Sequence, residues 1–132
     1  MSVLTERKYT CRVSSTLNRD TKQFGKKFLF DNREETCWNS DQGSPQWISL
    51  EFPELSSISG FSLQFQGGFA GKECYVETEG SLKVLDFYPE DSNKLQYFYL
   101  KERVHVKKIR IAFNSSSDFY GRITIYKLEF YP

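Results

Sequence analysis

Catalytic chemistry in this chain of 132 residues would have to come from a small set of reactive side chains. They are three cysteines (Cys11, Cys37 and Cys74) and a single histidine, His105. The cysteines show no C-x-x-C spacing, and His105 is the only imidazole that could activate a thiol. The sequence also lacks a glycine-rich phosphate loop, a His/Cys metal cluster and a credible Ser/His/Asp set. We therefore expect a protein that is not an enzyme and has no catalytic residue.

The odd number of cysteines predicts reduced thiols. Small secreted domains usually carry an even number of cysteines that pair as disulfides. The first residues, MSVLTERKYTC, contain no apolar run of signal-peptide length, and no later stretch is apolar enough to span a bilayer. We expect a protein of the nucleus or cytoplasm, without membrane partners, in which each cysteine is a small hydrophobic residue.

Charged residues are unevenly distributed, although the net charge is only +1. Residues 1–28 contain seven Lys or Arg and two acidic residues, whereas residues 29–60 contain one Arg and six acidic residues. The simplest interpretation is that both segments form solvated faces of one globule. The basic run 101–108 is interpreted in the same way, with contact to an acidic partner as the alternative. The near-zero total gives no general case for direct binding of nucleic acid.

Alternation of apolar and polar residues predicts short β-strands. In segment 46–52 the inward side chains are Ile48, Leu50 and Phe52, and the outward ones are Ser49 and Glu51. In segment 61–65 the inward side chains are Phe61, Leu63 and Phe65, and the outward ones are Ser62 and Gln64. Further strands are predicted at 82–88, 95–100, 109–113 and 123–130.

Turn-forming residues separate these strands, and only segment 23–30 suggests a helical turn. Many short strands at this spacing are typical of an antiparallel β-sandwich of the jelly-roll type. No Pro/Gly/Ser linker divides the chain, so residues 1–132 are expected to form a single domain.

The stretch 28–40 and the strand 46–52 together resemble the signature of discoidin or galactose-binding-like domains. Asp31 is followed five residues later by Thr36 and two residues after that by Trp38, and a W-I-x-L-x-F strand comes next. Segments 106–113 and 120–123 resemble the last two core strands of the same superfamily. The resemblance covers residues 14–130 and implies the same β-sandwich.

Further blocks resemble a family of small nuclear-receptor-associated proteins. They are residues 13–15, 23–27, 34–43, 65–69 and 86–91. This resemblance implies an intracellular protein-interaction module, a nuclear-receptor partner that represses the receptor's transcriptional activation. The alternative is a module that binds a carbohydrate or another small molecule. Extracellular discoidin domains join their ends by a disulfide, and here the chain end opposite Cys11 holds no cysteine, which favours the intracellular interpretation.

The superfamily resemblance also implies a structural Ca²⁺ site between the first loop and the closing strand. The implied ligands are Phe28, Asp31, Arg33, Thr36, Leu128 and Glu129. Ca²⁺ prefers six to eight oxygen ligands, and this set would combine two carboxylates with carbonyl and hydroxyl oxygens. The alternative is that Asp31 caps the backbone of its own loop and Glu129 is an exposed strand residue.

The loop end of the sandwich is the second candidate site, because such domains bind ligands there. Segments 38–42, 67–69 and 118–122 are expected to meet, and the candidate contact residues are Trp38, Asp41, Phe69, Phe119, Tyr120 and Arg122. Aromatic faces beside polar groups could stack on a sugar or grip a peptide. Alternatively, Trp38 and Tyr120 pack in the core or at its rim, and Arg122 pairs with Asp41 or Asp118. Phe69, flanked by glycines, is the strongest candidate for an exposed contact.

Overall fold

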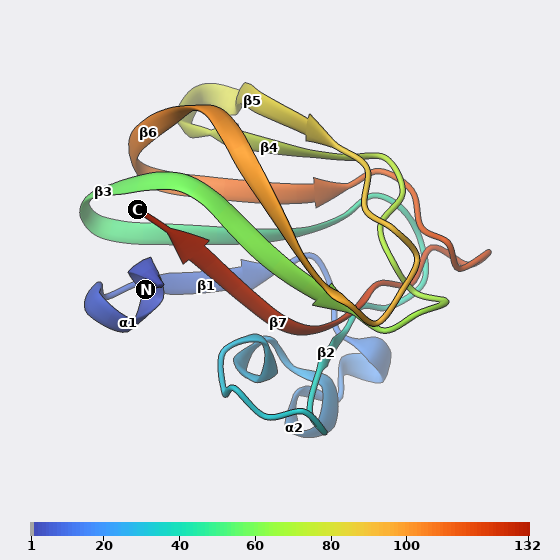
Figure 1. Cartoon of the computed structure of the whole chain (residues 1–132). Helices are drawn as coiled ribbons and strands as arrows, with labels where there is room; N and C mark the ends of the chain where they lie inside the picture. The colour runs from blue at the N-terminus through green and yellow to red at the C-terminus, as the bar shows by residue number, and fades with distance from the viewer. Residues whose placement is uncertain (1) are drawn as a thin grey trace.

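The computed structural model describes residues 2–132, apart from the side chain of Glu6. Its strands are β1 (Thr10–Val13), β2 (Trp38–Asn39), β3 (Gln46–Phe65), β4 (Cys74–Thr78), β5 (Leu82–Phe87), β6 (Leu95–Phe113) and β7 (Thr124–Tyr131). All strand pairs are antiparallel. The chain ends lie at one end of the strands, and several connecting loops gather at the other (Figure 1).

Two long strands, β3 and β6, belong to both layers of the molecule. The first half of β3 pairs with β1 and with the second half of β6, whereas its second half pairs with β7 and with the first half of β6. The pairing register shifts between Glu51 and Ser56 and again between Ile58 and Gly60, and β3 bends there (Figure 1). One layer is therefore β1–β3–β6–β4–β5 and the other β2–β7–β3–β6, which confirms the predicted antiparallel β-sandwich.

The sequence divided each long strand into two. Segments 46–52 and 61–65 are both parts of β3, and segments 95–100 and 109–113 are both parts of β6. The prediction was wrong here because it located the strands by apolar–polar alternation alone. In the structure, bulges at the bend carry the chain from one layer to the other without a loop.

Phenylalanine side chains fill much of the space between the layers. The ring of Phe61 lies 5.1 Å from Phe87, 5.3 Å from Phe98 and 6.0 Å from Phe130, measured between centroids. All six side chains predicted to point inward from segments 46–52 and 61–65 are buried. Inward alternation in the two halves of β3 thus follows the pattern that the sequence predicts.

Two side chains predicted to point outward are buried. Ser49 lies between Arg12 of β1 and Arg110 of β6 in the strand register, and these long side chains flank it. Ser62 lies beside Tyr131 of β7, whose hydroxyl group is 2.8 Å from the Ser62 hydroxyl. The prediction failed because a small outward side chain on a central strand is covered by larger neighbours.

Helical segments are short, and all but η3 lie within the first 29 residues. They are α1 (Val3–Glu6), η1 (Leu17–Arg19), α2 (Thr21–Phe24), η2 (Lys26–Leu29) and η3 (Glu79–Ser81). Asp20 caps α2 by accepting a hydrogen bond from the backbone N–H of Gln23. The helical turn predicted at 23–30 corresponds to the end of α2 and to η2. No helix within residues 2–132 has the length and apolar character needed to cross a membrane.

Candidate functional site

The loops that follow β3 and β6 meet at one end of the sandwich, together with the loop between β2 and β3 (Figure 1). Backbone hydrogen bonds connect them: Ser117 N donates to Ala70 O at 2.8 Å, and Gly43 N donates to Tyr120 O at 2.8 Å. The three segments that the sequence predicted to converge therefore do so.

Two strongly exposed aromatic side chains of this end are neighbours in sequence. Phe119 is 92% exposed and Tyr120 is 56% exposed, and their rings pack edge to face with centroids 5.2 Å apart. The turn that carries them requires Gly121, which has φ +84° and where a Cβ atom would lie 2.7 Å from the Gly43 carbonyl oxygen. A tight turn thus holds the two rings in solvent.

Arg122 is clamped by Asp118 at the base of this turn. Nε of Arg122 donates to Asp118 Oδ2 at 2.9 Å, Nη2 donates to Oδ1 at 3.2 Å, and the Arg122 backbone N–H donates to Oδ2 at 3.1 Å. The hydrogen bond from the guanidinium is the main reason why the pKa of Asp118 lies below its usual value. Of the two alternatives, Asp118 and not Asp41 is the partner of Arg122.

The guanidinium also covers aromatic faces. Its carbon lies 5.0 Å from the centroid of Phe69 and 5.8 Å from that of Tyr120. Phe69 is half-buried under Arg122, so the prediction that its side chain is exposed is wrong, whereas the Phe119 side chain is exposed. We call Phe69, Phe119, Tyr120 and Arg122 the loop-end platform.

Trp38 and Asp41 stabilise the fold around the platform. Trp38 has no exposed surface, and its indole Nε1 donates to Ser15 O at 3.0 Å, so it offers nothing to a ligand and the packing alternative describes it. The Asp41 backbone N–H donates to Ser15 Oγ, and its carboxylate accepts from Gln42 N at 3.0 Å, which closes the turn beside the platform.

The first loop, residues 30–37, is held closed by Asp31. One carboxylate oxygen accepts from the Arg33 backbone N–H at 3.1 Å, and the other accepts from the Thr36 hydroxyl at 2.6 Å. The Arg33 side chain points to Glu35, 2.9 Å away. These contacts match the alternative in which Asp31 caps its own loop.

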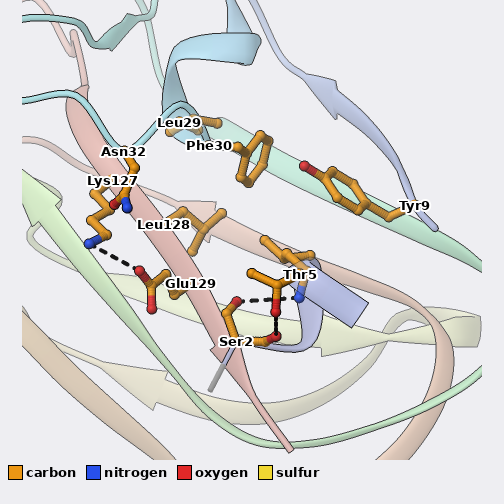
Figure 2. A pocket seen from close by; sticks show the side chains of 10 residues that line it. Ser2, Thr5, Tyr9, Leu29, Phe30, Asn32, Lys127, Leu128 and Glu129 are labelled. Carbon is orange, nitrogen blue, oxygen red and sulfur yellow. Dashed lines mark hydrogen bonds and ion pairs between the residues drawn. The ribbon is translucent and has the colours of Figure 1, made fainter. Parts of the chain in front are cut away.

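Glu129 is engaged on the closing strand rather than with Asp31. Its Oε1 lies 3.1 Å from Nζ of Lys127, and its Oε2 accepts from the Tyr131 hydroxyl at 3.3 Å. Figure 2 shows Lys127 and Glu129 beside Asn32 at a cavity of about 140 Å³, with Leu128 between them along β7. The buried Leu128 side chain faces the core.

The proposed calcium ligands do not fit a divalent cation well in this arrangement. Both carboxylates already have partners within the chain, and Lys127 places a positive charge next to Glu129. Phe28 is half-buried with the Lys27 ammonium 5.0 Å from its ring centroid. Among residues 2–132, no three His, Cys, Asp or Glu side chains are grouped so that they could hold a metal. The calcium site remains a prediction.

The thiols have the character of core residues. Burial raises the pKa of both Cys11 and Cys74 to about 12, and it also raises the pKa of the half-buried Cys37. A raised pKa keeps a thiol protonated and unreactive at neutral pH. His105 is exposed on β6.

Sequence reasoning missed two groups of residues. Lys127 and Glu129 are two positions apart on one strand, so they share a face, and this spacing could have identified the ion pair. The second group is a set of basic side chains around Trp47, which points outward when Ile48 points inward. The positive charge of segment 1–28 was the available signal.

Comparison with known proteins identifies close relatives in several vertebrates. The chain is 59% identical over 122 residues to the Xenopus laevis protein called nuclear receptor 2C2-associated protein, covering 89% of each chain. It is 56% identical over 122 residues to the Danio rerio protein of the same name, covering 89% of this chain and 86% of the relative. No protein-family model matches the chain.

Solved structures with the same fold include carbohydrate-binding modules of much lower identity. The family 32 module of Clostridium perfringens NanJ, in complex with galactose, matches with a TM-score of 0.78 at 14% identity, covering 94% of this chain and 93% of that one. Chitosan-binding module 2 of a Paenibacillus chitosanase/glucanase, in complex with chitotriose, matches with a TM-score of 0.75 at 21% identity, covering 93% and 95%. At these identities the likeness concerns the fold alone, and it confirms the predicted antiparallel β-sandwich.

Proposed function

This chain belongs to the nuclear receptor 2C2-associated protein family, and on that premise we propose that it binds a nuclear receptor through its loop-end platform. The observation that carries the proposal is the 92% exposure of Phe119 beside an Arg122 that is already oriented by Asp118. A large aromatic side chain held in solvent by a tight turn suits a protein contact.

The physical logic is that of a small interface hot spot. Aromatic and Arg side chains dominate such hot spots: aromatic rings bury much area and lose little conformational freedom, and an Arg side chain combines several hydrogen-bond donors with a long apolar stem. The Gly121 turn and the bidentate Asp118–Arg122 contact restrict these side chains before binding, so little ordering entropy remains to be lost. Nη1 of Arg122 has no hydrogen bond to any described residue and can donate to the partner.

The proposal includes the compartment and the consequence of binding. The protein would act in the nucleus or cytoplasm, where the receptor is found, and its function would be binding rather than catalysis. Occupation of the receptor surface would repress transcriptional activation, because a bound module excludes other partners from the same surface.

The test is a pull-down of the purified receptor by wild type and by Phe119→Ala. We expect truncation of Phe119 to weaken binding by about 1–4 kcal/mol, the range of interface hot spots. Tyr99→Ala is the matched control, because Tyr99 is 67% exposed but lies within the first half of β6, opposite Gly60 and outside the platform. Equal binding by Phe119→Ala and wild type would refute the platform as the contact surface. A reporter assay with the same variants tests repression.

A carbohydrate ligand is the second candidate. Exposed aromatic rings beside an Arg–carboxylate pair could also bind a sugar, and the solved structures with this fold include complexes with galactose and chitotriose. A glycan array and thermal melts with galactose and chitotriose discriminate between the two candidates. A melting temperature that rises with a sugar in wild type but not in Tyr120→Ala would favour the carbohydrate.

A further inference from the structure

A second concave surface lies away from the platform, between β1, the α2–η2 segment and the start of β3. It is a groove of about 450 Å³ lined by Arg12, Lys22, Lys26, Lys27 and Trp47, together with small and apolar residues. None of its lining residues is acidic. It shares no residue with the loop-end platform.

The positive charge of this groove is not neutralised within the described part of the chain. The ion pairs of residues 2–132 involve Arg7, Arg33, Lys83, Lys108, Arg122 and Lys127. Arg12, Lys22, Lys26 and Lys27 are exposed, and their side chains take part in none of these pairs. Asp20, the acidic residue nearest to Lys22 in sequence, accepts a hydrogen bond from Gln23 N as the cap of α2. The charges are therefore available to a partner.

Trp47 gives the groove an apolar wall with further positive charge behind it. The guanidinium carbon of Arg110 lies 4.2 Å from the Trp47 ring centroid, and the buried Arg110 Nε has no hydrogen-bond partner in the described residues. Glu77 is opposite Arg110 in the register of β4 and β6, yet the two form no ion pair. Trp47 therefore lies between Arg110 and the basic groove.

The backbone turn at Gly25 positions the lysines of α2 and η2. Gly25 separates α2 from η2, and a Cβ atom at this position would lie 2.5 Å from the Thr21 carbonyl oxygen. This close approach brings Lys22, on α2, and Lys26, on η2, to the same groove. The lysines are thus brought together by a specific turn, and their proximity is not simply a result of the many basic residues in this segment.

We propose that this groove binds an acidic peptide segment of a protein partner. Its four basic side chains can pair with carboxylates, and its Trp47 and Val13 side chains can contact apolar groups. The groove therefore suits a peptide that alternates carboxylates with apolar side chains. Flexible lysine ammonium groups hold a single phosphate less specifically than a rigid set of donors would. The contact would raise the association rate and would weaken with salt, because exposed charges are screened. This inference does not depend on the receptor assignment.

The experiment uses a fluorescein-labelled glutamate-rich peptide with a single leucine, followed by fluorescence anisotropy. The reference peptide carries glutamine at each glutamate position. We expect binding of the acidic peptide only, with the affinity falling severalfold as salt rises from about 50 to about 200 mM. In a nitrogen-15 NMR spectrum the Trp47 indole signal should shift, whereas that of the buried Trp38 should stay in place.

The decisive variant is the triple change Lys22→Gln, Lys26→Gln and Lys27→Gln, which should weaken the peptide about tenfold or more. The matched control, Lys101→Gln with Arg103→Gln and Lys107→Gln, removes the same charge from exposed positions at the bend of β6. Thermal melts of both variants verify folding. Phe119→Ala should bind the peptide normally, which separates this site from the platform.

Three results would overturn the proposal. One is equal weakening in the two triple variants, which would show that only net charge matters. Another is no binding of the acidic peptide at low salt. The third is displacement of the peptide by millimolar inorganic phosphate or by duplex DNA with the same variant dependence, which would assign the groove to another class of anion.

Discussion

The loop end and the first loop both contain an aspartate that closes its own loop, but only at the loop end does this aspartate hold an arginine beside exposed aromatic rings. The Asp31 carboxylate accepts hydrogen bonds from the Arg33 backbone N–H and from the Thr36 hydroxyl, and both donors are used in closing the loop. Asp118 is satisfied by Arg122, which keeps a free Nη1 and lies over two aromatic rings. The same anchoring device therefore supports either a structural turn or a contact site, depending on the residue that it anchors.

Trp38, which connects the two regions through β2, should show the largest effect. The side chain has no exposed surface and donates a hydrogen bond to Ser15 O, so Trp38→Ala leaves a cavity and an unpaired carbonyl. We expect a loss of about 3–5 kcal/mol in the free energy of unfolding, measured by denaturant titration. Phe119→Ala, by contrast, should change it by less than about 0.5 kcal/mol. A small loss for Trp38→Ala would show that the region between the two loops is not part of the core.

Asp118→Ala should have a smaller effect that concerns both stability and binding. It removes three hydrogen bonds to Arg122 at a partly exposed site, so we expect a loss of about 1–2 kcal/mol of stability. Receptor binding should also weaken, since Arg122 is no longer oriented over Phe69. Arg122→Lys keeps the charge but not the bidentate geometry, and it should weaken binding in the same direction. Unchanged binding in both variants would mean that the platform does not need its clamp.

The sequence predicted the sandwich from local alternation patterns, and it predicted the meeting of the loops from the resemblance to discoidin-like domains. Alternation identified the inward side chains of β3, and the aromatic, glycine and acidic residues of 118–122 marked the loop end. It could not predict which aromatic residue is exposed. Phe69 and Phe119 both lie near glycines, and only the position of Arg122, held by Asp118, decides that Phe69 is covered. Nor could it join 46–52 to 61–65, because a bulge in the middle of a strand depends on the partner strand.

Cys37 provides a chemical probe of the first loop. Burial raises the pKa of Cys11 and Cys74 to about 12, so their thiolate fractions near pH 8 are minute, whereas Cys37 is half-buried. We expect a thiol reagent to modify Cys37 first in the folded protein and all three cysteines after unfolding without a reductant. The free energy of unfolding should also depend on pH. Because the pKa values of Cys11 and Cys74 are higher in the folded than in the unfolded protein, the two thiols add stability below about pH 9, and this contribution is lost as the pH rises towards 12. Fewer than three reactive thiols in the unfolded protein would reveal a disulfide.

Calcium should have the smallest effect, and this distinguishes a loop that closes itself from one that needs an ion. A cation bound only by the folded protein would add about 2.7 kcal/mol at a hundredfold excess over its Kd. To bind here it would have to compete with Thr36 for Asp31 and with Lys127 for Glu129. We therefore expect the same melting temperature with chelator and with millimolar Ca²⁺.

Two variants make this calcium test decisive. Asp31→Ala should destabilise the protein to the same extent with and without Ca²⁺, because it removes the cap of the first loop in either condition. Lys127→Met removes the ammonium beside Glu129, so a rise in melting temperature with Ca²⁺ should be easiest to detect in this variant. A melting temperature of wild type that rises with Ca²⁺, and no longer does so in Asp31→Ala and Glu129→Gln, would contradict the self-closed loop. It would establish the shared ion between the first loop and β7 that the superfamily resemblance implies.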